Sequence, residues 1–475
     1  MALVVLLPLL LGALAFALPS RRERPLLLLA GAVGHSAGVA WLWARPGRGL
    51  EGWLALDAPG KVILATVSAL FLASAAYAQR YLRLRDDREN RIFVGGLLVL
   101  LSALSVVALA QHLGILWVAI EVTTLTTAPL IYFDRDARSL EASWKYLLVC
   151  SLGVALALLG TFFLALSSAG PGGPHSLVVG ELVAAGPSLS RPWVRAAFVF
   201  LLVGYGTKMG LAPLHSWKPD AYGEAPGLLG AILSGGITSA AFLALARVLQ
   251  VCGAAGEGAF ARQALLAMGL LSMALAGIFI VGQRDYKRML AYSSVEHMGI
   301  LAVGLGVGGA AGAGAFFHAL NNGLVKGVLF LAAGSIHRSY GTKQVDEVRG
   351  ALRRLPLSGP LFLAGFFAVT GAPPFGPFFS ELTILRGVFA SGHALAGCLF
   401  LAFVAVIFVG MGAIVLGVVQ GDPAGCPERP GQEDGWGNAA PALALLAASL
   451  ALGLYLPPSL RDLFTAASAT VGGPR

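Results

Sequence analysis

Residues 204–226 read GYGTKMGLAPLHSWKPDAYGEAP and form part of a membrane-length apolar stretch. The segment places the amine of Lys208 at bilayer depth, and Pro213 must interrupt the helix beside it, because proline lacks a backbone N–H and clashes with the preceding turn. A charge at the bilayer centre costs about 2.5–3.5 kcal/mol on insertion scales, so it usually faces a partner or a water-filled path. Broken helices of this kind commonly line ion pathways. The segment therefore predicts an ion translocator, and we expect the ion to be a proton.

The composition of the whole chain agrees with a membrane setting. Of its 475 residues, 57% are hydrophobic and 12% are charged, about half the charge of a soluble domain. Glycine is abundant, with 62 residues, as in close-packed transmembrane helices. The net charge of +9 is spread over short loops between apolar spans, so we expect a lipid bilayer around the protein and no nucleic-acid partner. The predicted class is an all-α polytopic membrane protein.

Windows of about 20 apolar residues predict roughly fourteen spans. They lie near residues 2–18, 25–44, 58–79, 92–110, 112–133, 143–167, 194–217, 226–250, 262–282, 290–309, 312–336, 357–390, 393–418 and 438–457. Loops after odd-numbered spans carry most of the arginines and lysines, whereas loops after even-numbered spans hold few. The positive-inside rule then places the odd loops in the cytoplasm and both termini outside.

The spans suggest two related halves. Residues 1–90 would hold three N-terminal helices, residues 91–252 a first five-helix repeat broken near Pro213, and residues 253–420 a second repeat broken near Pro373 in GAPPFGPF. Residues 421–475 would form a loop and a C-terminal helix. Because five crossings are an odd number, the second repeat must be inverted relative to the first. Two inverted repeats with discontinuous helices are typical of transporters.

Two further groups in the first half accompany Lys208. Glu121 lies amid apolar and hydroxyl residues, and we expect it on a proton path; alternatively it is a neutral acid hydrogen-bonded to Thr124. Lys208 itself could be a static partner in a charge pair that ties helices together. His215 lies past the break and could connect Lys208 to water.

The second half carries a polar stripe. His318, Asn322 and Lys326 are spaced by four and eight residues, which places them along one helix face and favours a hydrated path. Glu381 follows the second break and could be the last acidic group of the path, or could pair with Arg386.

Glu296 and His297 are adjacent in AYSSVEHMGI, residues 291–300. Neighbouring helical residues point about 100° apart, so the two need not act as one site. Structural hydrogen bonding is an equally good interpretation of this pair.

Enzyme motifs are missing from the sequence. We find no phosphate-binding loop, dinucleotide fingerprint or HExxH zinc motif. The four cysteines, Cys150, Cys252, Cys398 and Cys426, are scattered, whereas iron–sulfur or zinc ligation needs clustered thiolates. We expect no catalytic residues, metal, cofactor or redox centre of its own in this chain.

The same segments resemble the antiporter-like proton-pumping subunits of respiratory complex I and of membrane-bound group 4 NiFe hydrogenases. The resemblance runs from about residue 90 to 420 and is sharpest in GYGTKMGLAPLHSWKPDAYGEAPG, AYSSVEHMGI, LNNGLVKGVLFLAAGSI, VRGALRRLP and GAPPFGPFFSELTIL. YSSVEHMG together with GAPPFGPFFSELTIL is most similar to the hydrogenase-4 or formate hydrogenlyase type.

The resemblance implies fourteen helices with two inverted five-helix repeats. It also implies that Glu121 and Lys208 form a charge pair whose opening and closing drives protons, that Lys326 is the central lysine of the eleventh helix with His318 upstream, and that Glu381 is the terminal residue of the twelfth. Many complex I relatives carry a lysine in the eighth helix, where this chain has only Ser239. The link between the half-channels would then rely on water and hydroxyl groups.

The leading hypothesis is a proton-translocating membrane-arm subunit of a redox-driven hydrogenase or complex I-like oxidoreductase complex in the bacterial or archaeal plasma membrane. Its partners would be other membrane-arm subunits and a soluble NiFe hydrogenase or iron–sulfur module. One alternative is a subunit of a multi-subunit Na⁺/H⁺ antiporter. The other is a non-pumping scaffold in which the buried charges only hold helices together.

Overall fold

The computed structural model describes residues 1–45, 49, 52–85, 88–170, 175–429 and 434–472. Within these residues the chain is all-helical, with three isolated β-bridges and no strand. The first half contains α1 (Ala2–Ala17), α2 (Arg24–Ala44), α3 (Ala58–Tyr81), α4 (Arg91–Leu109), α5 (Leu113–Ile131), α6 (Ala137–Ser167), α7 (Val179–Ala184), α8 (Arg191–Met209), α9 (Trp217–Glu224), α10 (Gly227–Ile232) and α11 (Thr238–Ala254). The second half contains α12 (Gly258–Ile280), α13 (Tyr286–Val307), α14 (Gly309–Tyr340), α15 (Ala351–Arg354), α16 (Ser358–Val369), α17 (Gly376–Ala390), α18 (Ala394–Val419), α19 (Trp436–Leu454) and α20 (Pro458–Gly472).

The helices confirm the polytopic membrane class. Among the described residues, 11 helical segments are long and apolar enough to cross a membrane, and α1 and α16 are shorter apolar helices. Every predicted span coincides with one helix or with a broken pair of helices. The number of fourteen crossings and the two inverted repeats stay predictions.

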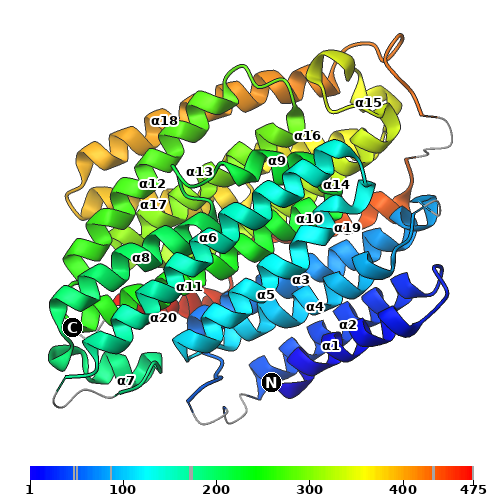
Figure 1. Cartoon of the computed structure of the whole chain (residues 1–475). Helices are drawn as coiled ribbons and strands as arrows, with labels where there is room; N and C mark the ends of the chain where they lie inside the picture. Colours follow the sequence, from blue (N-terminus) through cyan, green and yellow to red (C-terminus); the bar gives the residue numbers. More distant parts are fainter. Residues whose placement is uncertain (46–48, 50–51, 86–87, 171–174, 430–433, 473–475) are drawn as a thin grey trace.

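The helices pack side by side in one bundle, with α1 and α2 at one edge and α18 at the opposite edge (Figure 1). The apolar part of segment α10–α11 is entirely buried in the middle, and α14 is buried over most of its length. Outer helices such as α6 and α18 instead expose large apolar side chains, among them Leu148, Leu152, Leu395 and Val409. A continuous apolar exterior is the surface that lipid tails cover. Polar side chains are therefore concentrated in the centre.

Both predicted breaks are present. The seventh predicted span divides into α8 and α9 on either side of Pro213, and the twelfth divides into α16 and α17 around Pro373. The eighth predicted span is also irregular, because α10 and α11 are joined by a π-helical turn, Leu233–Ile237. Such π-turns occur often at functional sites. The π-helical turn is fully buried, whereas Pro213 at the first break and Pro373 and Pro374 at the second are exposed.

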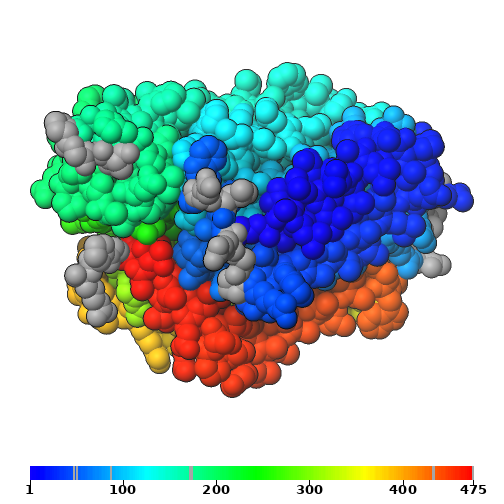
Figure 2. Space-filling model, turned by 90° about the horizontal axis from the view of Figure 1, so that it is seen from below, coloured from blue at the N-terminus to red at the C-terminus, as the bar shows by residue number. Residues whose placement is uncertain are grey.

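Three helices lie outside the predicted spans, namely α7, the one-turn α15 and α20. In α20 the polar residues Arg461, Asp462 and Thr465 interrupt the apolar run, so no apolar window detects it. Only one face of this helix is buried, through Phe464, Ala467 and neighbouring positions spaced by three or four residues. Figure 2 shows α20, in red, on the surface between the N-terminal helices in blue and the segment in green.

Candidate functional site

Lys208 lies in the last turn of α8, beside the carbonyl end that the break creates. Gly210 ends the helix with a φ of 77° and donates its N–H to Gly206 O. Nζ of Lys208 donates to Thr124 Oγ1 at 2.8 Å and to Tyr146 OH at 2.7 Å. Helix C-termini favour cations, and hydroxyl acceptors satisfy a buried ammonium group. The break therefore accommodates a buried lysine whose hydrogen-bond partners are neutral.

Glu121 lies in α5 and is held by a hydroxyl group of α6. Ser151 Oγ donates to Glu121 Oε1 at 3.0 Å, and Oε2 is buried with no hydrogen-bond partner among the described residues. Within the described residues, no ion pair joins Glu121 to Lys208, so the charge pair implied by the resemblance is not formed in this conformation. Thr124, which accepts from Lys208, is one turn from Glu121, so the acid and the lysine meet the same face of α5.

Lys218, in α9, was missed by the sequence analysis. Its side chain is fully buried, and Nζ donates to Ser294 Oγ at 3.1 Å and approaches Ser294 O at 3.4 Å on α13. A side chain at Gly210 would collide with that of Lys218, so the glycine at the break also makes room for this second lysine. The sequence did carry a signal, a second lysine just past Pro213, but the partner is 76 residues away.

Lys326, on α14, is linked to Glu296 through a serine. Its Nζ donates to Ser293 Oγ at 2.7 Å, and Ser293 Oγ lies 3.4 Å from Glu296 Oε2. All three residues are buried. The structure therefore joins the lysine of the polar stripe to an acid on α13, two residues beyond the serine that contacts Lys218.

His297 points away from its neighbour Glu296, as the 100° rotation per residue predicts. Its Nδ1 lies 2.9 Å from His318 Nε2, and His318 Nδ1 lies 2.9 Å from Ser380 Oγ on α17. The two imidazole rings are stacked, with centroids 5.1 Å apart. A carboxylate oxygen of Glu381 lies within 4.8 Å of one nitrogen of each histidine. Three predicted site residues, His297, His318 and Glu381, thus converge from α13, α14 and α17, together with Ser380.

Glu381 lies against the second break. Gly371 has a φ of 70°, and a Cβ there would lie 2.5 Å from Glu381 Oε2, so only glycine leaves room for the carboxylate. Among the described residues, Glu381 forms no ion pair with Arg386, and the local pairing considered above is not observed. Each break therefore combines a left-handed glycine with a buried ionisable side chain packed against it.

The three remaining predicted residues, Asn322, Ser239 and His215, form no hydrogen bond to another predicted site residue in the described part of the chain. Both polar atoms of the Asn322 side chain, Ser239 Oγ and His215 Nδ1 are buried and lack a hydrogen-bond partner in the described part of the chain. Buried polar atoms of this kind are commonly satisfied by ordered water. His215 does not reach Lys208, and its ring packs 6.0 Å from Phe279 and 6.2 Å from Tyr292 between centroids.

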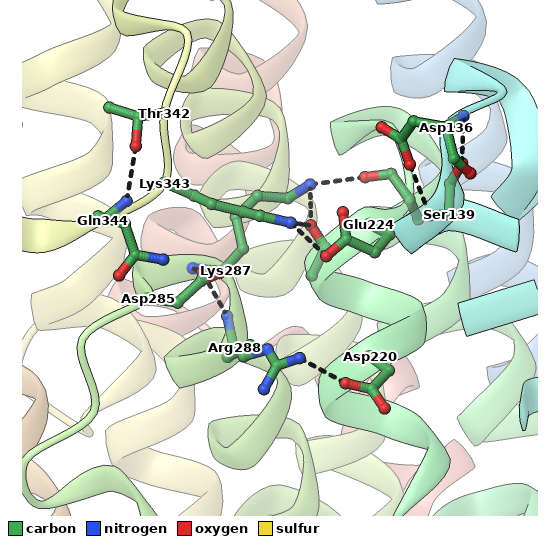
Figure 3. A network of polar contacts seen from close by, with 12 residues as sticks. Asp136, Ser139, Asp220, Glu224, Asp285, Lys287, Arg288, Thr342, Lys343 and Gln344 are labelled. Carbon is green, nitrogen blue, oxygen red and sulfur yellow. Dashed lines mark hydrogen bonds and ion pairs between the residues drawn. The ribbon is translucent and has the colours of Figure 1, made fainter. Parts of the chain in front are cut away.

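A network at one end of the bundle fixes α9 (Figure 3). Lys287 Nζ donates to Gly223 O at 2.9 Å and to Ala225 O at 2.7 Å, and Lys343 Nζ donates to Gly223 O at 2.9 Å and pairs with Glu224. Cations commonly stabilise the carbonyl end of a helix in this way. These two lysines were counted as loop charges in the orientation argument, but both are buried and hold the end of the helix that carries Lys218.

Asp285 begins α13 beside this network. Its carboxylate accepts from the N–H groups of Lys287 and Arg288, which makes it an N-cap. Burial raises the pKa of Asp285 above its ordinary value.

Arg247 is another buried charge that the sequence analysis did not single out. From the middle of α11 it donates to both carboxylate oxygens of Asp57, at 2.8 and 3.2 Å, and to Gln111 Oε1 and Ala108 O. This arrangement clamps α11 to the start of α3 and the end of α4. Because it is an ion pair with further carbonyl partners, it resembles a static helix tie more than a proton-carrying group.

The chain matches one protein-family model, described as NADH:quinone oxidoreductase/Mrp antiporter, TM, over residues 110–408. This range includes every predicted site residue from Glu121 to Glu381.

Curated relatives include a hydrogenase-4 component F homolog of Methylacidiphilum infernorum, which is 32% identical over 417 residues that cover 85% of each chain. They also include NADH-quinone oxidoreductase subunit N of Desulforudis audaxviator, which is 33% identical over 353 residues, 74% of this chain and 68% of the relative.

Two solved structures show the same fold. A chain of the Mrp complex from Dietzia sp. superposes with a TM-score of 0.88 at 23% identity, and the match covers 100% of this chain and 97% of that one. A chain of respiratory complex I from Thermus thermophilus superposes with a TM-score of 0.79 at 26% identity, and the match covers 97% and 98%.

Proposed function

The chain belongs to the family of antiporter-like membrane subunits described as NADH:quinone oxidoreductase/Mrp antiporter, and we propose that it translocates protons as a membrane-arm subunit of a redox-driven hydrogenase or complex I-like assembly. Its relatives are subunits of multi-subunit membrane complexes, so further membrane-arm subunits are expected beside it. The proposal extends to the route of the proton and to the soluble partner that drives it.

The observation that carries the proposal is a series of three buried lysines whose Nζ atoms donate hydrogen bonds to hydroxyl groups. Lys208 donates to Thr124 and Tyr146. Lys218 donates to Ser294, and Lys326 donates to the preceding residue, Ser293. Each buried ammonium group costs about 2.5–3.5 kcal/mol, and none of the three forms an ion pair with a described acid that would offset the cost. A fold that only needed helix ties would use pairs such as Arg247 with Asp57.

Lys218 is our candidate for the mid-membrane link, for which the sequence showed no lysine on the eighth helix. The resemblance implies a mid-membrane link that relatives make with a lysine on the eighth helix, and Ser239 stands near that depth here. Lys218 on α9 packs against Gly210, two residues after Lys208, and its Nζ donates to Ser294, next to the serine that Lys326 contacts. We assign it the linking role, with water at Ser239 and Asn322 completing the connection.

A proton route follows from these contacts. Glu121, held by one hydroxyl group and otherwise unpaired, takes up a proton and passes it to Lys208 on the shared face of α5. Transfer continues through Lys218 and the serine pair to Lys326 and Glu296. The His297–His318 pair then delivers the proton to Glu381 at the second break. A proton arriving at one lysine repels the next, so each transfer favours release further along the series.

Energy for this movement comes, in the proposal, from electron transfer in a neighbouring soluble NiFe hydrogenase or iron–sulfur module. The rival function is that of a Na⁺/H⁺ antiporter subunit, and the Mrp superposition keeps it open because it shows the same fold. Purification of the tagged chain from its native membrane separates the two. We expect co-purification with an iron–sulfur or NiFe module, and recovery with small antiporter subunits alone would overturn the redox-driven assignment.

A further inference from the structure

We propose that His297, His318 and Glu381 bind one divalent transition-metal ion of the Zn²⁺ type, and that the bound ion blocks proton transfer. The binding itself does not depend on the proposed function, whereas the block rests on it. The sequence indicated no metal site, because the three ligands come from α13, α14 and α17 and no two share a metal-binding spacing.

The donor atoms are already grouped. His297 Nδ1 and His318 Nε2 are 2.9 Å apart, and one ligand atom from each of the three residues lies within 4.8 Å of the others. Bonds of about 2.0–2.2 Å to a tetrahedral ion place neighbouring ligand atoms roughly 3.3–3.6 Å apart. A modest opening of the histidine pair and an approach of the carboxylate therefore complete three corners of the tetrahedron.

Hydrogen bonding fixes which nitrogen of His318 is free to bind. The Ser380 hydroxyl donates to Pro377 O at 2.9 Å, so its oxygen accepts from His318 Nδ1–H. In the neutral ring this leaves the lone pair on Nε2, directed at His297. Metal-ligating histidines are oriented in the same way, by donating their second N–H to a neighbouring group.

His297 can supply its own lone pair without releasing a proton from the protein. With His318 Nε2 as acceptor, the proton of neutral His297 is on Nδ1, and His297 Nε2 has no hydrogen-bond partner among the described residues. Transfer of that proton from Nδ1 to Nε2 of the same ring frees Nδ1 for the metal. The ion thus takes the place of the hydrogen between the two imidazoles, and that hydrogen is the one the proton route uses.

The chemistry of the three ligands sets the class of ion. Two imidazoles and one carboxylate are typical ligands of Zn²⁺ and similar ions, whereas Mg²⁺ and Ca²⁺ prefer oxygen ligands throughout. A cavity of about 940 Å³ lies against α14 and α17 and is lined by Phe317 and Thr383, whereas none of the three ligands lines it and both histidines are fully buried, so the ion enters only as the helices move apart.

Co²⁺ binding to the purified full chain in lipid nanodiscs tests the site, since tetrahedral Co²⁺ gives visible absorption bands that the free hydrated ion lacks. We expect one Co²⁺ per chain, displaced by Zn²⁺ and not by Mg²⁺. His318→Asn and His297→Asn should abolish the signal, and Ser380→Ala should weaken binding roughly 10–100-fold. His35→Asn is the matched control, because His35 is also fully buried and bonded to two serines but belongs to no group of three metal-ligating side chains among the described residues.

Equal Co²⁺ binding by the wild type and His318→Asn, or absence of binding by the wild type, would overturn the metal site. The block is tested by adding Zn²⁺ to the assembly in sealed vesicles while proton and electron transfer are both followed. Loss of proton transfer on Zn²⁺ addition in both the wild type and His35→Asn, with proton transfer intact in both when Zn²⁺ is omitted, supports the block. Specific Co²⁺ binding with unchanged proton transfer would leave the metal site standing and contradict the proposed proton route instead.

Discussion

Replacement of Lys208 by methionine separates a functional lysine from a structural one. Methionine keeps an unbranched chain of similar length and removes the charge. The change deletes the donor to Thr124 Oγ1 and to Tyr146 OH. Hydrogen bonds to charged groups contribute about 1.5–3 kcal/mol each, so roughly 3–6 kcal/mol is lost.

The same change removes the cost of a buried charge, about 2.5–3.5 kcal/mol. The two effects partly offset each other, and the net loss of stability is about 1.5 kcal/mol at the middle of both ranges, roughly half of what loss of a buried ion pair costs. We therefore expect Lys208→Met to assemble in the membrane at nearly normal levels and to lose coupled proton transfer.

Arg247→Met provides the contrast, because Arg247 is as deeply buried as Lys208. It leaves Asp57 without its partner, and breaking a buried ion pair costs about 3–5 kcal/mol, toward the lower end here because Asp57 is 25% exposed. We expect a lower yield of assembled protein with unchanged proton transfer per assembled molecule.

Both variants are assayed in sealed proteoliposomes, with a pH-sensitive dye for proton uptake and with the amount of assembled protein measured by native gel. Proton uptake by Lys208→Met at the wild-type rate would refute the reasoning. A loss of pumping in Arg247→Met that exceeds its loss of assembly would show that the two buried cations cannot be separated in this way.

Three further outcomes follow from the same contacts. Ser293→Ala removes the hydroxyl that the lysine of α14 donates to, and should slow proton transfer at least tenfold in the vesicle assay without loss of assembly. Gly371→Ala should displace the Glu381 carboxylate and reduce proton transfer, whereas Gly392→Ala, which has a similar positive φ but open space around it, should carry only about 1–2 kcal/mol of backbone strain; equal pumping in both would contradict this. Asp285→Ala should lower stability by about 0.5–2 kcal/mol through loss of the N-cap, and Asp285→Asn should restore most of it in thermal unfolding.

The sequence predicted those features that depend on local chemistry. Proline cannot continue a helix wherever it lies, so the break near Pro213 and the one near Pro373 could be read directly. Spacing along one helix likewise predicted that His318, Asn322 and Lys326 share a face, and all three are buried in α14.

Features that depend on which helices become neighbours could not be predicted. Lys218 finds its hydrogen-bond partner Ser294 on α13, and the histidine pair depends on contact between α13 and α14. Lys287 and Lys343 looked like loop charges because the carbonyl end of α9 that they bind is brought to them only by folding.

A continuous proton route across the middle of the bundle requires Lys218. The decisive measurement is the number of protons moved per electron pair by the purified assembly in sealed vesicles, compared between the wild type and Lys218→Met. We predict that electron transfer continues and that the ratio falls by the whole contribution of this subunit. A ratio equal to that of the wild type would contradict a route through this lysine.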